Sequence, residues 1–245
     1  MPWNLAQARL TCFFREPLEN QKNDWWEEVL GVPPDESVTK RTEGIHTDKG
    51  IVNGRRLLLN IQRNKVDWLV SPVEQLSDEL FNFIGTYDES TIQLRDMLQN
   101  WVSTAGQIKR IAIGAIALEP VEDRENGYRF LQTMLPALTI QPETSSDFFF
   151  QINRPTIGEF REVAIKINRL MKWSVSQVEF HRQNLAFNTG LESDLVASGH
   201  AARCELDIST DQDQDQEIDP AIRIDVLNRL FELGRSILQE GDVIS

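Results

Sequence analysis

The sequence predicts an α+β protein whose two halves share one core, each with the element order β-α-β-β-β-α. The main observation is a match between residues 55–74 and residues 161–179, about a hundred residues apart. With one residue dropped from the second segment, the identical pairs are Arg55/Arg161, Ile61/Ile167, Arg63/Arg169, Trp68/Trp173, Val70/Val175, Ser71/Ser176, Val73/Val178 and Glu74/Glu179. Upstream, Glu16-Pro17-Leu18-Glu19 matches Glu119-Pro120-Val121-Glu122. These matches indicate a tandem duplication whose halves are related by a pseudo-two-fold axis.

The first half, residues 1–108, is predicted to contain a strand at 9–14, a short helix at 25–30, a strand at 37–51, a hairpin at 57–70 and an amphipathic helix at 94–105. Asn23 or Asp24 can cap the short helix, and Gly31 ends it. Apolar residues alternate on both arms of the hairpin, and Asn64-Lys65 forms its turn.

The second half, residues 109–245, repeats this order with a strand at 111–118, a helix at 128–135, a strand at 148–153, a hairpin at 163–180, an extra strand pair at 180–188 and 201–209, and a C-terminal helix. Asp219-Pro220 is a strong helix start, since proline is favoured at the first helical position. The acidic loop 209–219 precedes this helix. Its alternating like charges favour a solvated connector rather than a calcium loop, which would need a turn glycine and a later glutamate.

The duplication has consequences for single residues. Arg55 should face Glu74 across the first hairpin, Arg161 should face Glu179 across the second, and Trp68 should superpose on Trp173. Arg63 and Arg169 are expected at the two hairpin tips. They are either solvated tip residues or a converging site for an anion or a partner protein.

Aromatic residues are expected mainly in the core, where Trp25, Trp26, Trp68, Trp101 and Trp173 occupy apolar positions of patterned elements. Phe149 differs from its neighbours Phe148 and Phe150, because alternate residues of a strand face opposite sides. It is therefore expected either to contact a covering helix or to form an exposed hydrophobic anchor.

The bulk composition is that of an ordinary globular domain, with 40% hydrophobic and 26% charged residues. The formal net charge of -13 disfavours general nucleic-acid binding, which depends on Lys and Arg. Two cysteines are too few for a disulfide framework, and no transmembrane or secretory segment is visible. We therefore expect a cytoplasmic protein with reduced thiols.

Catalytic signatures are absent from the sequence, which contains neither a phosphate-binding glycine loop nor a G-x-S-x-G elbow. The weak metal candidates are Glu74, Glu179 and His181, with His200 and Cys204 as further donors if they lie close by. We expect ordinary surface positions for these side chains, and neither a metal nor another cofactor.

Three short motifs carry a resemblance to a known family: Phe13-Phe14-Arg15-Glu16-Pro17-Leu18, Arg110-Ile111-Ala112-Ile113-Gly114 and Leu206-Asp207-Ile208. In this order the chain resembles a sporadically distributed bacterial family of uncharacterised proteins. The family's scattered occurrence implies mobile or defence-associated genes, and it implies no catalytic residues. The predicted topology also resembles the duplicated β-α-β-β-β modules of vicinal-oxygen-chelate proteins. Their metal enzymes carry His or Glu on the first and last strand of each module. Here Glu74 and Glu179 occupy last-strand positions, but the first strands at 9–14 and 111–118 offer no ligand.

The sequence therefore favours a non-enzymatic protein-binding or regulatory subunit of a bacterial phage-defence or mobile-element operon. Its partner would be another protein encoded in that operon, bound through Arg63, Arg169 and Phe149. Two alternatives stay open. The groove between the halves could hold a small molecule or a metal-dependent active site, or the acidic second half could mimic nucleic acid.

Overall fold

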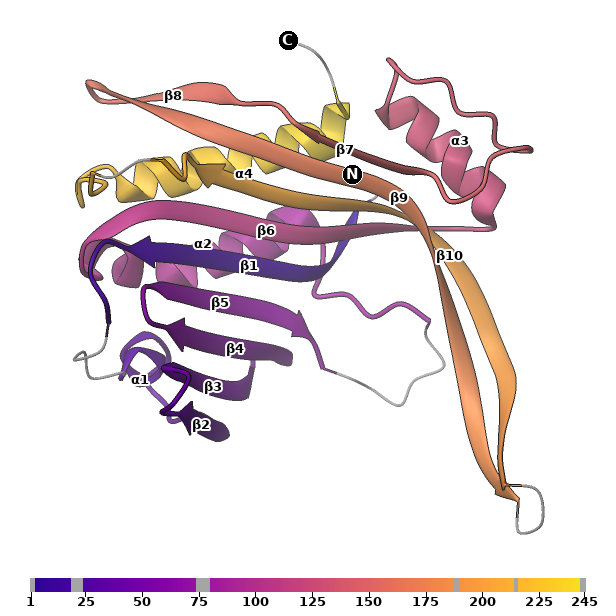
Figure 1. The fold of residues 1–245 in the computed structure, drawn as a ribbon, viewed down its shortest axis with the longest axis horizontal. Coiled ribbons are helices and arrows are strands. Elements are labelled where there is room, and N and C mark those ends of the chain that lie inside the picture. The colour runs from indigo at the N-terminus through magenta and orange to yellow at the C-terminus, as the bar shows by residue number, and fades with distance from the viewer. Residues whose placement is uncertain (1–2, 19–23, 74–79, 187–189, 214–215, 243–245) are drawn as a thin grey trace.

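The computed structural model describes the chain except residues 1–2, 19–23, 74–79, 187–189, 214–215 and 243–245, and gives only the backbone of 180–186 and 190–196. The described residues form one ten-stranded antiparallel sheet and four helices, which confirms the α+β class. The strand order is β2-β3-β4-β5-β1-β6-β10-β9, and both β7 and β8 pair with the outer edge of β9 (Figure 1).

The chain enters this sheet in two successive runs. The first run consists of β1 (Asn4–Phe14), α1 (Trp25–Leu30), β2 (Glu36–Lys40), β3 (Ile45–Val52), β4 (Arg55–Gln62), β5 (Lys65–Pro72) and α2 (Tyr87–Thr104). The second run consists of β6 (Ile108–Val121), α3 (Arg124–Met134), β7 (Phe149–Asn153), β8 (Thr156–Phe160), β9 (Val163–Ala186), β10 (Gly190–Thr210) and α4 (Arg223–Glu240). Within the described residues each run therefore reads β-α-β-β-β-β-α. The first run has one strand more than predicted, and the second has one strand fewer than the six predicted with its extra pair.

Local signals account for the ends of the first two helices. Gly31 ends α1 in the left-handed conformation with φ of 69°, as its sequence predicts. Thr86 and Glu89 form a capping box at the start of α2, each side chain accepting a backbone N–H of the other residue. The expected proline start of the last helix is wrong, because Asp219-Pro220 lies in a turn and α4 begins at Arg223.

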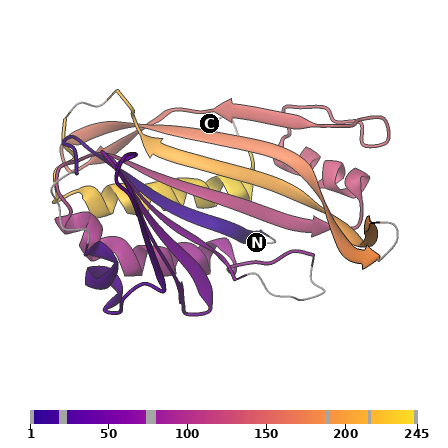
Figure 2. The ribbon, with the colours of Figure 1, turned by 60° about the horizontal axis from the view of Figure 1, so that its bottom comes forward.

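The core lies between the sheet and the helices, which all cover the same face (Figure 2). Directly paired residues of neighbouring strands share a face, so Leu10 of β1, Trp68 of β5 and Ile113 of β6 point together into this core. All six tryptophans are buried, as expected for the five assigned to the core. Trp68 packs edge-on against Trp101 of α2 at a centroid distance of 5.8 Å, and it stacks on Trp26 of α1.

The predicted hairpin at 163–180 is wrong, since these residues belong to the single strand β9. The reversal lies earlier, between β8 and β9, where Arg161 adopts a positive φ of 54°. Arg161 therefore occupies a turn and does not face Glu179, which pairs with Ser198 of β10. On the first hairpin Arg55 pairs with Pro72, and Glu74 lies outside the described residues.

The expected superposition of Trp68 on Trp173 is also wrong, because their strands occupy different positions in the sheet. Trp68 lies on β5, which pairs directly with the central strand β1, whereas Trp173 lies on β9, separated from the central strand β6 by β10. The extra strand pair is wrong in its partners as well, because residues 201–209 pair with 168–176 of β9. Local patterns located these strands but not their neighbours.

Candidate functional site

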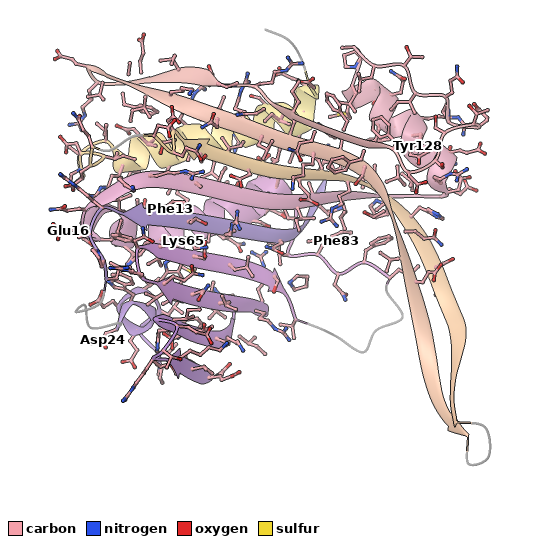
Figure 3. The ribbon with its side chains drawn as sticks, in the orientation of Figure 1. Phe13, Glu16, Asp24, Lys65, Phe83 and Tyr128 are labelled. Carbon is pink, nitrogen blue, oxygen red and sulfur yellow. The ribbon has the colours of Figure 1, made fainter. Side chains whose placement is uncertain are left out.

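The face of the sheet opposite the helices carries the clearest candidate surface. One cross-strand row on this face runs through Leu58, Leu69, Arg9, Gly114, Asp207 and Leu170, on β4, β5, β1, β6, β10 and β9. A parallel row runs through Ile116, Glu205, Lys172 and Gln151. We call this surface, with the adjoining Phe13, Thr11, Asp67 and Lys65, the helix-free face; Figure 3 labels Phe13 and Lys65 on it.

Four bases of the helix-free face lie beside acids, whereas Arg110 donates a hydrogen bond to the Ser209 hydroxyl at 2.9 Å. Arg9 Nη2 lies 3.7 Å from Asp207 Oδ2, and Lys65 Nζ lies 2.8 Å from Asp67 Oδ2. Glu205 contacts two bases, with Arg203 Nη2 at 2.7 Å and Lys172 Nζ at 3.5 Å. The charges of these four bases are therefore largely neutralised by the neighbouring acids.

Half-buried apolar side chains lie between these ion pairs. Leu58, Leu69, Ile116 and Leu170 are all partly accessible on the helix-free face. Phe13 adds an aromatic ring, with the Arg110 guanidinium carbon 4.7 Å from its centroid. The centre of the sheet therefore combines apolar contact area with neutralised charge, a composition found in protein interfaces.

Two shallow hollows mark this face. Hollow A, about 290 Å³, is lined by Arg9, Ile116, Lys172 and Glu205 among others. Hollow B, about 270 Å³, is lined by residues that include Arg110, Asn153 and Lys166. Leu170 and Asp207 line both hollows, so A and B are adjacent parts of one depression over β6, β10 and β9.

Phe149 is the predicted site residue whose position fits a binding surface best. It is 61% exposed at the start of the edge strand β7 and pairs with Ser174, on the face away from the helices. Its neighbours Phe148 and Phe150 pack against the core instead. Of the two placements expected from its alternation, the structure has the exposed one.

The two predicted arginines do not come together. Arg63 is exposed in the turn between β4 and β5, as expected for a hairpin tip. Arg169 lies within β9 on the helix side, where its Nε donates to the carbonyl of Arg154 at 2.7 Å. Burial lowers the pKa of the Arg169 guanidinium. Because β1, β6 and β10 separate β5 from β9, these arginines cannot bind one small ligand.

The weak metal candidates are only partly described. Glu179 is exposed and accepts a hydrogen bond from Gln177 Nε2 at 2.8 Å, whereas Glu74 and the His181 side chain lie outside the described residues. Among the side chains that the structure describes, no three His, Cys, Asp or Glu residues gather as a metal site requires.

Neither cysteine suits nucleophilic chemistry. Cys12 and Cys204 are fully buried on the helix side of β1 and β10. Burial raises the pKa of both thiols well above the usual range, because the thiolate would lose its hydration. Both therefore act as small core residues.

Sequence reasoning missed Arg9, Asp207, Glu205 and Lys172 as parts of a surface. The alternation in Leu206-Asp207-Ile208 shows that Asp207 faces away from its apolar neighbours, but not that Arg9 lies nearby.

None of the described helices is long and apolar enough to cross a membrane. Comparisons with protein-family models, with curated proteins and with solved structures found no match to this chain.

Proposed function

We propose that this protein is a non-enzymatic binding subunit that holds another protein on its helix-free face. The observation that carries this proposal is the combination of half-buried apolar side chains with ion pairs across the centre of the sheet. Such a surface can form a desolvated apolar centre inside a polar surround, which is where binding energy concentrates in protein interfaces.

The charge pattern supports a protein partner over nucleic acid. Binding to a nucleic-acid backbone depends on Lys and Arg side chains that neutralise phosphates and so release the counterions condensed on them. On the helix-free face Arg9, Lys65 and Lys172 are each within 3.7 Å of a carboxylate oxygen. A phosphate would have to displace these carboxylates, whereas a protein can complement both signs of charge.

The backbone of the β9–β10 hairpin supports a binding role as well. Beyond the last β6 pair, Val121 with His200, residues 178–186 and 190–199 pair only with each other in the described part of the chain. This arm projects from the body in Figure 1. An isolated two-stranded ribbon is marginally stable in water and leaves both outer edges without hydrogen-bond partners. A partner that covers the arm would stabilise the ribbon and would supply hydrogen-bond partners for its outer edges.

The biological setting in this proposal is the bacterial cytosol, with the partner encoded in the same phage-defence or mobile-element operon. Its support is the resemblance carried by the motifs at 13–18, 110–114 and 206–208. The proposal also includes an ancient duplication of the chain. In it, β1 corresponds to β6, β4 to β9 and β5 to β10, according to their places in the sheet. Its support is the repeated element order and the strand order around the central β1–β6 pair.

Co-purification of the tagged protein from its host, followed by mass spectrometry, tests the proposal. The informative variants are Phe149→Ala and Leu170→Asp, which change the helix-free face without removing a core side chain. Ile92→Ala is the matched control, because Ile92 is an exposed apolar residue of α2. We expect a partner whose recovery falls in both face variants and is unchanged in the control. A partner retained equally by all variants, or a monomer with measurable turnover of a substrate, would refute the proposal.

A further inference from the structure

The strand β2 forms one end of the sheet, and one side of its backbone is open (Figure 1). Among the described residues it pairs with β3 alone. All five of its residues, Glu36–Lys40, are exposed. An edge strand of this kind presents a row of backbone N–H and C=O groups to which a further strand can bond. A strand of suitable sequence can therefore extend the sheet at β2.

The opposite end of the sheet is less suited to such an extension. It consists of two short strands, β7 and β8, on the outer side of β9. Arg154 and Pro155 separate these strands, and proline has no backbone N–H to donate. Of the two ends of the sheet, β2 therefore offers the uninterrupted edge.

The two ends of β2 carry opposite charges. Glu36 begins the strand, Lys40 ends it, and the apolar Val38 lies midway between them. Two copies of β2 laid antiparallel about a two-fold axis at Val38 would place Glu36 opposite Lys40 at both ends, with Ser37 opposite Thr39. Opposite charges that face each other directly stabilise a strand pair, whereas like charges destabilise it. The sequence of β2 is therefore complementary to itself.

The backbone of β2 permits this register. Successive residues of an antiparallel strand direct their N–H and C=O groups alternately toward one side and the other. Every second residue of β2 therefore bonds to β3, and the residues between them are directed to the open edge. The positions that would face each other, 36 with 40 and 37 with 39, are an even number of residues apart. Groups directed outward in one copy would thus meet groups directed outward in the other.

The side chains of β2 are accessible for these contacts. Glu36 Oε2 lies 3.4 Å from Lys49 Nζ, and Glu43 Oε2 lies at the same distance from Lys40 Nζ. Both are exposed ion pairs, which contribute little to stability and can rearrange when another charge approaches. Val38 is 38% exposed, so a second copy would also cover an apolar side chain at the centre of the contact.

The charged side chains of β2 lie on the same side of the sheet as the helix-free face. Val38 pairs with Thr47 of β3, and this cross-strand row continues through Asn60 to Asp67. Residues two positions apart on a strand share a face, so Glu36 and Lys40 lie on this side with Val38. Pairing of two β2 strands would therefore continue the helix-free face of one copy into that of the other.

We propose that the chain forms a two-fold symmetric dimer in which two β2 strands pair antiparallel about Val38 and join both sheets into one. A ladder of two five-residue strands is short, and stable interfaces typically bury about 1,200–2,000 Å² in total. The dimer should therefore dissociate on dilution. Its test needs no partner protein, so its outcome is separate from that of the proposed function.

Sedimentation velocity of the full chain over a range of concentrations tests this dimer, and we expect a monomer–dimer equilibrium. Glu36→Lys brings like charges together at both ends of the paired strands, and so does Lys40→Glu. Each variant should therefore weaken dimerisation about tenfold or more. An equimolar mixture of the two variants should dimerise again, because each facing pair then has opposite charges. Glu232→Lys, an exposed charge reversal on α4, should leave dimerisation unchanged.

A cysteine cross-link tests the position of the axis. Directly opposite residues of paired strands have Cβ atoms about 4.5–5.5 Å apart. Mild oxidation should therefore link two copies of Val38→Cys but not two copies of Ile92→Cys, which alters an exposed residue of α2. Cys12 and Cys204 are buried and should not compete.

The altered residues are all exposed, so thermal unfolding should show intact folding in each variant. The inference is overturned if the unaltered chain stays monomeric at submillimolar concentration. It is also overturned if the dimer persists in both charge variants of β2, which would place the contact elsewhere, or if their mixture fails to restore it.

Discussion

Arg9 on β1 reaches Asp207 on β10 across the backbone of Gly114, which occupies the strand between them. Their nearest side-chain nitrogen and oxygen are 3.7 Å apart. A Cβ atom on Gly114 would lie 3.2 Å from the Arg9 guanidinium, so glycine leaves the space that this arginine crosses. The contact joins the two runs of the chain at the centre of the helix-free face.

Replacement of Gly114 by valine should displace Arg9 and disrupt this crossing. Because the ion pair is exposed, its loss should change the free energy of unfolding by no more than about 1 kcal/mol. Partner recovery in the co-purification should nevertheless fall, since a branched side chain would project into hollow A. Urea denaturation checks the first expectation. Unchanged recovery with a displaced arginine would show that hollow A lies outside the interface.

Arg223 is expected to be a major source of stability where α4 meets α2. It is 1% exposed, pairs with Glu217 at 2.7 Å, and donates to the carbonyls of Val102, Ala105, Gly106 and Ile218. Arg223→Met keeps the apolar stem but leaves these acceptors unsatisfied, so stability should fall by about 3 kcal/mol or more. Arg229→Met on the same helix removes only an exposed pair and should cost less than about 1 kcal/mol. Urea denaturation of both variants measures the difference, and equal losses would contradict this role.

Gly234 of α4 should tolerate no side chain while Tyr87 is present. An added Cβ would overlap the Tyr87 hydroxyl, which donates to the Phe231 carbonyl at 3.0 Å. Gly234→Ala should therefore destabilise the protein by about 1–3 kcal/mol through overpacking. In a Tyr87→Phe background the same change should cost less, because the overlapping oxygen is gone. A double-mutant cycle measures this coupling, and strict additivity would argue against the contact.

The capping box of α2 should make stability depend on pH in the acid range. Hydrogen bonds from the Thr86 hydroxyl and backbone N–H lower the pKa of Glu89 below its usual 4.5. The ionised carboxylate therefore stabilises the folded state above the unfolded pKa, and this contribution is lost as the pH falls through the folded value. Glu89→Gln should reduce the loss of stability between pH 6 and pH 3 in thermal unfolding. Thr86→Ala should cost about 1 kcal/mol at neutral pH.

Both thiols should be unreactive in the folded protein. Burial disfavours the thiolate and raises the pKa of Cys12 and of Cys204, so a thiol reagent at pH 8 should modify neither. In denaturant both should react. Rapid modification of either thiol under native conditions would indicate local opening of β1 or β10.

Much of the local structure is predictable because its causes are local. Gly31 ends α1. The spacing of Leu94, Leu98 and Trp101 predicts a helix there, and these three side chains are buried in α2. The alternation of three phenylalanines separates Phe149 from its neighbours before any tertiary contact is known. These features depend on side-chain periodicity and turn chemistry within a few residues.

Only the tertiary structure decided which strands are neighbours. The alternation at 163–180 is the same for a hairpin and for one long strand, and β9 is continuous because β10 pairs with it along its length while β7 and β8 pair with its outer edge. Arg9 and Asp207 are likewise brought together by β6, from positions nearly two hundred residues apart. The sequence by itself determined the periodicity of each strand. Strand order and the face that the helices cover depend on burying apolar surface across the whole chain, and no single segment encodes them.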